Sequence, residues 1–106
     1  MKRFAVIMVT CASPKEAHAI STALLKKKLV ACSNIISGVN SIFWWKGKIN
    51  SAKESILLLK ACLSNFKKIE KAVKDIHSYE IPEIIAIPII AGSADYLKWV
   101  SKETGI

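Results

Sequence analysis

The feature that most constrains this chain is a long extended segment that ends in a tight turn with two adjacent tryptophans at its tip. The segment spans residues 31–45. At roughly 3.3 Å per residue it would reach on the order of 50 Å, whereas a domain of this size is about 30 Å across. Trp44 and Trp45 point to opposite faces of a ribbon. The strand therefore either bends, for which Gly38 offers a bulge point, or leaves the domain to be covered by another subunit.

Length and composition favour one globular domain covering residues 1–106. Of the 106 residues, 52% are hydrophobic and 23% are charged, a balance that excludes intrinsic disorder. The longest apolar runs, such as residues 84–90, fall far short of the roughly 20 residues needed to cross a bilayer. The chain starts with basic residues followed by an apolar run, as a signal peptide does. The run ends at Thr10, and no small-residue cleavage site follows it. We interpret this run as a first core strand and expect no membrane partner.

Three cysteines, Cys11, Cys32 and Cys62, form an odd set without C-x-x-C spacing. Each lies in or beside an apolar segment. This pattern indicates reduced thiols in a cytoplasmic protein rather than a disulfide framework. Cys32 and Cys62 are interpreted as buried hydrophobic residues.

The net charge of +8, from 16 Lys and Arg against eight Asp and Glu, would suit an anionic partner. Its distribution favours another interpretation. The lysines at residues 26–28 close a predicted helix, where cations complement the helix dipole. Four further lysines occupy the solvent face of another predicted helix: Lys67, Lys68, Lys71 and Lys74. Solvated helix faces are favoured over a nucleic-acid or phosphate patch, so nucleic acid is the least favoured partner.

The first half of the chain predicts a strand, a helix and a long hairpin. Residues 4–10 form a β-rich apolar run, and the Ser-Pro-Lys-Glu of residues 13–16 forms a capping box that opens a helix. Residues 29–45 and 49–60 predict two further strands, joined at Lys46-Gly47 because glycine supplies the positive φ that two-residue hairpins require. The apolar stripe of the helix comprises Ala17, Ile20, Leu24 and Leu25.

The second half predicts a helix, a strand and a terminal helix. Ser64 is the expected cap of a helix whose apolar positions are Phe66, Ile69, Val73 and Ile76. Residues 83–91 predict a strand in which Pro88 cannot donate to a ladder, so the strand lies at an edge or carries a bulge. A short helix follows over residues 94–102.

This order predicts an α+β, ferredoxin-like β-α-β-β-α-β fold with a C-terminal helix and an antiparallel sheet. Helices would cover one face of the sheet. The other face has no cover from the same chain, and its strands are not polar at alternate positions. That face and the edge at Pro88 predict a homo-oligomer.

Six segments match, in order, the motifs of a known family. They are Val-Thr-Cys-Ala-Ser-Pro at 9–14, Leu-Val-Ala-Cys-Ser-Asn-Ile-Ile-Ser-Gly-Val at 29–39, Ser-Ile-Phe-Trp-Trp-Lys-Gly-Lys-Ile at 41–49, Leu-Leu-Lys at 58–60, His-Ser-Tyr-Glu-Ile-Pro-Glu-Ile-Ile-Ala at 77–86, and Tyr-Leu-Lys-Trp at 96–99. On these segments the chain closely resembles the CutA family of divalent-ion tolerance proteins along nearly its whole length. Ser78 stands where the family often has proline, and Lys46 where it often has an acidic residue.

The resemblance implies a compact homotrimer of ferredoxin-like subunits with long hairpins between neighbours. Phe43, Trp44, Trp45 and Trp99 are then expected at the trimer interface, where packing against another subunit is favoured over stacking on a base. No catalytic reaction is implied. The chain also lacks a nucleophile elbow, a P-loop and a dinucleotide glycine motif, so we expect neither an enzyme nor an organic cofactor.

The resemblance also implies a role in tolerance of copper and other divalent metals, with Cys11, His77 and Glu83 as the matching ligands. Thiolate, imidazole and carboxylate form a plausible set for Cu(II) or another divalent ion. The three residues are far apart in the chain and must meet in the fold or across subunits. The alternatives remain open: Cys11 as a small core residue, His77 as a hydrogen-bonded loop residue, and Glu83 as the partner of a lysine.

A second function follows by analogy with the trimeric PII signalling proteins, which sense small ligands at clefts between subunits. In this chain Lys60, Tyr79 and Glu54 are grouped with His77 as cleft residues on the resemblance alone. The rival hypothesis is therefore a small-molecule sensor or interaction scaffold that binds an anionic ligand near Lys60 and Tyr79.

Overall fold

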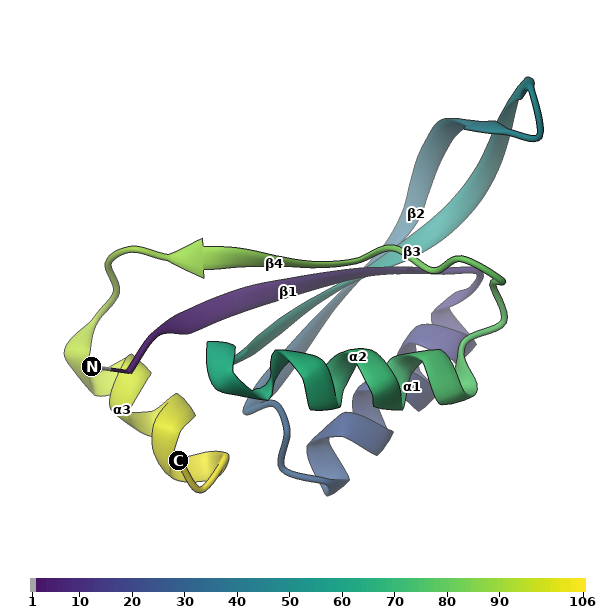
Figure 1. Ribbon diagram of the computed structural model, residues 1–106. Coiled ribbons are helices and arrows are strands. Elements are labelled where there is room, and N and C mark those ends of the chain that lie inside the picture. The colour runs from purple at the N-terminus through teal and green to yellow at the C-terminus, as the bar shows by residue number, and fades with distance from the viewer. Residues whose placement is uncertain (1) are drawn as a thin grey trace.

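The computed structural model describes residues 2–106, which form four strands, three α-helices and one short 3-10 helix (Figure 1). In chain order the elements are β1 (Phe4–Cys11), α1 (Pro14–Lys26), β2 (Cys32–Trp45), β3 (Lys48–Cys62), the 3-10 helix η1 (Leu63–Asn65), α2 (Phe66–Ile76), β4 (Ile84–Ile89) and α3 (Ala94–Glu103). This is the predicted order of elements, and each predicted boundary lies within three residues of the observed one.

The four strands form one antiparallel sheet in the order β2-β3-β1-β4. The predicted α+β, ferredoxin-like arrangement is confirmed. Pro88 lies in β4 at the edge of the sheet, opposite Ala5 of β1. An edge strand tolerates proline because the missing N–H can face away from the ladder.

The hairpin of β2 and β3 projects from the body of the domain as an arm (Figure 1). The longest dimension of the protein is 44 Å, against 26 and 23 Å for the other two. Gly38, with a φ of +73°, lies in the register shift between Ile36 and Val39, as the sequence predicts for a bulge. At the tip both Lys46 and Gly47 have positive φ, 51° and 79°, as a type I′ turn requires.

The core lies between the sheet and the helices α1 and α2, which lie on the same face of the sheet (Figure 1). Alternate residues of β1 are fully buried on this face, from Ala5 to Cys11. Leu57 and Leu59 of β3 lie beside them in the ladder and are also fully buried. The helices contribute the buried side chains Ala17, Ile20, Leu24, Ile69 and Val73.

The opposite face of the sheet is covered only at one end, by α3. Cys62 and Cys32 lie within hydrogen-bonding distance of Thr104 and Tyr96, two residues from this part of the chain. Further along the face, large apolar side chains are exposed, among them Ile36, Ile85 and Ile87. The predicted uncovered face is therefore present in the single chain.

The cap of α2 is not the predicted one. The chain forms η1 first, so α2 begins at Phe66 with Asn65 before it rather than Ser64. Asn65 makes no side-chain cap and instead donates through Nδ2 to the carbonyl of Leu29, 3.1 Å away. Two residues predicted on apolar stripes, Leu25 and Ile76, are 41% and 49% exposed, because each lies near the C-terminal end of its helix.

The lysine-rich face of α2 is solvated, as expected. Lys67 and Lys74 pair with Glu70, and Lys71 pairs with Asp75, all within the helix. Such exposed pairs contribute little to stability. In the part of the chain that the structure describes, no helix is long and apolar enough to cross a membrane.

Candidate functional site

Three elements meet at the C-terminal end of β1. Cys11 ends that strand, Glu16 lies in the first turn of α1, and His77 directly follows α2. Their ligand-type atoms, one per residue, all lie within 4.8 Å of one another. The Cys11 side chain is fully buried, and the His77 and Glu16 side chains are only 0% and 14% exposed. We call these three residues the Cys-Glu-His cluster.

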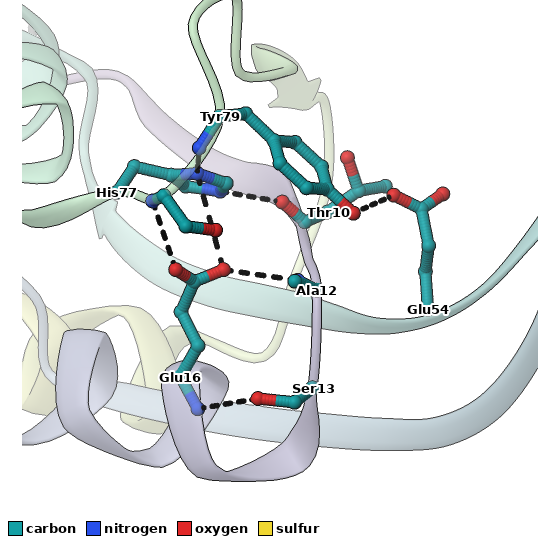
Figure 2. Close-up of polar contacts among 8 residues, drawn as sticks. Thr10, Ala12, Ser13, Glu16, Glu54, His77 and Tyr79 are labelled. Atoms are coloured by element: carbon teal, nitrogen blue, oxygen red, sulfur yellow. Dashed lines mark hydrogen bonds and ion pairs between the residues drawn. The ribbon is translucent and has the colours of Figure 1, made fainter.

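The hydrogen bonds of His77 determine which ring nitrogen carries the proton (Figure 2). Nε2 lies 2.7 Å from the carbonyl oxygen of Thr10, which can only accept, so Nε2 is the donor. Nδ1 accepts the backbone N–H of Tyr79 at 3.0 Å. The lone pair is therefore on Nδ1, the nitrogen 3.9 Å from Glu16 Oε1.

Glu16 connects the start of α1 to the loop after α2. Its Oε1 accepts the N–H of Ala12 and its Oε2 accepts the N–H of Ser78, each at 2.9 Å (Figure 2). Its own N–H donates to Oγ of Ser13 at 3.1 Å, which completes the cap predicted for this helix. Burial acts to raise the pKa of this carboxyl, but the hydrogen bonds and nearby His77 outweigh it and hold the pKa below the usual value.

Whereas the surroundings of Glu16 favour its charged form, those of Cys11 disfavour the thiolate. Burial, with smaller contributions from the carboxylates of Glu16 and Glu54, raises the pKa of its thiol to about 12. The thiol is therefore protonated at neutral pH. A cation that binds here must displace this proton, since the thiolate is the ligand form.

Tyr79 connects the Cys-Glu-His cluster to the other face of the sheet. Its ring lies 4.8 Å from the His77 ring, and its hydroxyl donates to Glu54 Oε2 at 2.5 Å (Figure 2). Glu54 lies in β3 and is only 7% exposed. Burial and the hydrogen bond to this carboxylate raise the pKa of Tyr79 well above its usual range.

A hollow of about 870 Å³ opens beside Tyr79, between the outer part of the arm and the loop before β4. Three of the eight acidic residues line it: Glu54, Glu80 and Glu83. Phe43, Trp44 and Trp45 form part of its wall. Among its lining residues there is no lysine or arginine, although the chain has 16 of them.

The structure thus brings together two of the three predicted metal ligands. Cys11 and His77 meet, but the third member of the cluster is Glu16, and Glu83 lies in the wall of the hollow. Ile84, which follows Glu83, pairs with Val9 of β1 and packs against the core. Successive side chains of an extended segment alternate between faces, so Glu83 lies toward the other face of the sheet, away from Cys11. The sequence pattern identifies Glu16 only as a capping residue. Its position could have indicated a second role. Glu16 lies in the first helical turn after Cys11, which places its carboxylate close to the end of β1.

The other predicted site residues are distributed over the molecule. Tyr79 and Glu54 are in contact, whereas Lys60 bonds to Asn34 across the β2–β3 pair and does not line the hollow. The arm-tip residue Trp44 is 72% exposed. Trp99 lies in α3 against Tyr96, with 5.6 Å between ring centroids.

One further buried group in this region was not predicted. The side-chain oxygen of Ser55 has no hydrogen-bond partner among the described residues, and Ser55 is 1% exposed. Ser55 of β3 is the register partner of Cys11. Nothing in the sequence distinguishes Ser55 from other serines, because both its burial and its pairing arise from the register of two distant strands.

Comparison with known proteins identifies the family. The family model described as CutA1 divalent ion tolerance protein matches residues 5–103. The chain belongs to the CutA family. It is 39% identical to the divalent-cation tolerance protein CutA of Thermus thermophilus over 94% of this chain and 97% of that protein. Protein CutA 1, chloroplastic, of Oryza sativa is 34% identical over 93% of this chain, which spans about half (56%) of that relative.

A solved structure of the family agrees with the fold. The structure described as the periplasmic divalent cation tolerance protein CutA from Archaeoglobus fulgidus superimposes with a TM-score of 0.92 at 40% identity, covering 98% of this chain and 99% of that one. The family resemblance and the ferredoxin-like fold predicted from the sequence are both confirmed.

Proposed function

We propose that this protein binds a divalent cation such as Cu(II) weakly at the Cys-Glu-His cluster and acts in tolerance of, or response to, such ions. One observation carries the proposal: a thiol, a carboxylate and an imidazole from three separate elements converge within 4.8 Å. The names of the relatives, which are divalent-cation tolerance proteins, support the same function.

The donor set fits Cu²⁺ or Zn²⁺. Sulfur, nitrogen and carboxylate oxygen are the ligands these ions take in proteins. The tautomer of His77 also fits, because a metal-binding histidine commonly donates its other ring N–H to a backbone carbonyl, and Nε2 of His77 donates to Thr10 in this way. When bound, the ion would supply charge at the junction of β1, α1 and the loop after α2.

The same contacts favour weak rather than tight binding. The lone pair of His77 Nδ1 already accepts from Tyr79, and both oxygens of Glu16 already accept backbone N–H groups. The Cys11 thiol must also lose a proton that its burial retains. Coordination of a cation therefore competes with these hydrogen bonds. The free energy of cation binding is smaller by the free energy that the displaced hydrogen bonds contribute.

Calorimetric titration of Cu²⁺ and of Zn²⁺ into the full chain tests this proposal. His77→Gln, Cys11→Ser and Glu16→Gln should each weaken binding by about tenfold or more. His18→Gln is the matched control for His77, because the chain has only these two histidines and His18 is exposed on α1. Glu83→Gln is the control for Glu16. Equal affinities for wild type and His77→Gln would exclude this cluster, and a loss with Glu83→Gln alone would return the carboxylate ligand to Glu83.

We further propose that the working form is a homotrimer in which the arms lie between subunits. Exposed apolar residues on the open sheet face and the arm support this, notably Ile42, Trp44 and Ile49 at 76%, 72% and 64% exposure. A monomer rarely exposes such contiguous apolar surface without a partner. Trp44 and Trp45 with Phe43 are the proposed arm contacts, and Trp99 is a further one on α3.

A second candidate is a small-molecule sensor or interaction scaffold that uses clefts between subunits. The hollow beside Tyr79 supports a ligand site, but its three glutamates and its lack of lining lysines favour a cation over the anion expected near Lys60. A thermal-shift screen separates the two: a rise in Tm with a polyamine and none with inorganic phosphate supports the acidic hollow. The reverse result would favour Lys60.

A binding role in a reducing, cytoplasm-like compartment completes the proposal, without catalysis or an organic cofactor. The three cysteines Cys11, Cys32 and Cys62 are free thiols, and two of them are buried. Such thiols need no oxidising compartment. Two relatives are named for other compartments, the chloroplast and the periplasm, so fractionation of the source cells is the direct test.

A further inference from the structure

Ser55 occupies a position where the fold otherwise places apolar side chains. The residues of β3 that share its face, Leu57, Leu59 and Ala61, are all fully buried and apolar. They pair in register with Val9, Ile7 and Ala5, whereas Ser55 pairs with Cys11. The hydroxyl thus enters the core directly across from the thiol of the Cys-Glu-His cluster.

This hydroxyl is buried without compensation from the protein. Ser55 is 1% exposed, and its Oγ has no hydrogen-bond partner within residues 2–106. Burying a hydroxyl without a partner costs free energy, which an alanine at the same position would avoid. Ser21, the other buried serine facing this layer, shows the contrast, since its Oγ is bonded to Oγ of Ser33 at 2.7 Å.

We infer that Ser55 supplies a fourth donor, its hydroxyl oxygen, to the cation site formed by Cys11, Glu16 and His77. The inference rests on the proposed function and adds a ligand to the same site. Directly opposite residues of antiparallel strands have Cβ atoms about 4.5–5.5 Å apart and project from one face. Two ligands of one tetrahedral Zn²⁺, a sulfur at about 2.3 Å and an oxygen at about 2.1 Å, lie about 3.6 Å apart. Facing Cys11 and Ser55 can meet this requirement.

The donor set becomes one sulfur, one nitrogen and two oxygens from four different elements: β1, α1, β3 and the loop after α2. A four-donor set matches the four-coordinate geometry that Zn²⁺ and Co²⁺ adopt in proteins with thiolate and imidazole ligands. Ser55 thus determines the metal specificity of the site. A copper(I) site would have a second sulfur at this position, whereas Ser55 supplies a hard oxygen.

The test uses the full chain with Zn²⁺ in calorimetry and Co²⁺ in visible absorption. Ser55→Ala should weaken Zn²⁺ binding about tenfold and reduce the intensity of the Co²⁺ d–d bands. The metal-free variant should be as stable as wild type or more stable, because an unpartnered hydroxyl has been removed. Ser21→Ala is the matched control, since it should destabilise the metal-free protein by removing the bond to Ser33 and leave Zn²⁺ affinity unchanged.

A gain-of-function variant makes the test independent of any loss of folding. Ser55→Cys should tighten Co²⁺ binding and strengthen the thiolate-to-metal charge-transfer band. Unchanged Zn²⁺ affinity in Ser55→Ala, or an unchanged Co²⁺ spectrum in Ser55→Cys, would overturn the role of Ser55 alone if Cys11→Ser and His77→Gln still weaken binding. Wild-type affinity in both Cys11→Ser and His77→Gln would overturn the proposed function together with this inference.

Discussion

The hydroxyl of Tyr79 donates to the buried carboxylate of Glu54 at 2.5 Å, which joins the loop after α2 to the middle of β3. The backbone N–H of the same tyrosine donates to His77. One residue therefore connects the acidic hollow on one side with the Cys-Glu-His cluster on the other.

Removal of this hydroxyl should destabilise the fold. Tyr79→Phe leaves Glu54 buried without its donor, so we expect a loss of about 1–3 kcal/mol in the free energy of unfolding. Urea denaturation followed by circular dichroism measures it. Glu54→Gln, which keeps an acceptor oxygen, should cost less than Glu54→Ala. Wild-type stability in Tyr79→Phe would show that the hydrogen bond is not maintained in solution.

The pKa of Glu16 predicts a loss of stability in acid. Its pKa in the folded protein lies below the ordinary value of a glutamate carboxyl, so the folded state binds fewer protons than the unfolded state near that ordinary value. The stability that the Glu16 carboxylate contributes is complete above the ordinary pKa. It is lost as the pH falls through the lower pKa of the folded state. Denaturation midpoints from pH 6 downward should fall less steeply in Glu16→Gln than in wild type. Identical slopes would contradict the stabilised carboxylate.

The pKa of Cys11 predicts a loss of stability in base. Folding raises it from 9.0 to about 12, so between these values the folded state keeps a proton that the unfolded state has released. The stabilisation of the neutral thiol is complete below pH 9 and is lost as the pH rises toward 12. Cys11→Ala should flatten the stability profile above pH 9. Parallel profiles for wild type and Cys11→Ala would refute this prediction.

The exposed arm predicts assembly that depends on its tryptophans. Analytical ultracentrifugation at micromolar concentration should give the mass of three chains for wild type. Trp44→Lys should shift the population toward smaller species, because a charge replaces apolar surface that is 72% exposed in one chain. His18→Lys, on the exposed side of α1, is the control and should sediment as wild type does. A folded wild-type monomer would contradict the proposed trimer.

Much of the fold follows from interactions between neighbours in the chain. The cap formed by Ser13 and Glu16, the turn at Gly47 and the bulge at Gly38 were each predicted, because a hydrogen bond or a φ angle within a few residues determines them. The cap of α2 was not predicted correctly. Asn65 donates to Leu29, 36 residues earlier in the chain, and no local pattern encodes that contact.

The sequence by itself determined the residue types available at the site, the strand that ends beside Cys11 and the helix that ends before His77. The tertiary structure decided that Glu16 rather than Glu83 joins them, that Ser55 lies opposite Cys11, and which lone pairs are already occupied. The reason is geometric. Periodicity and caps act over a few residues, whereas strand register and the face on which each side chain lies decide which distant side chains meet.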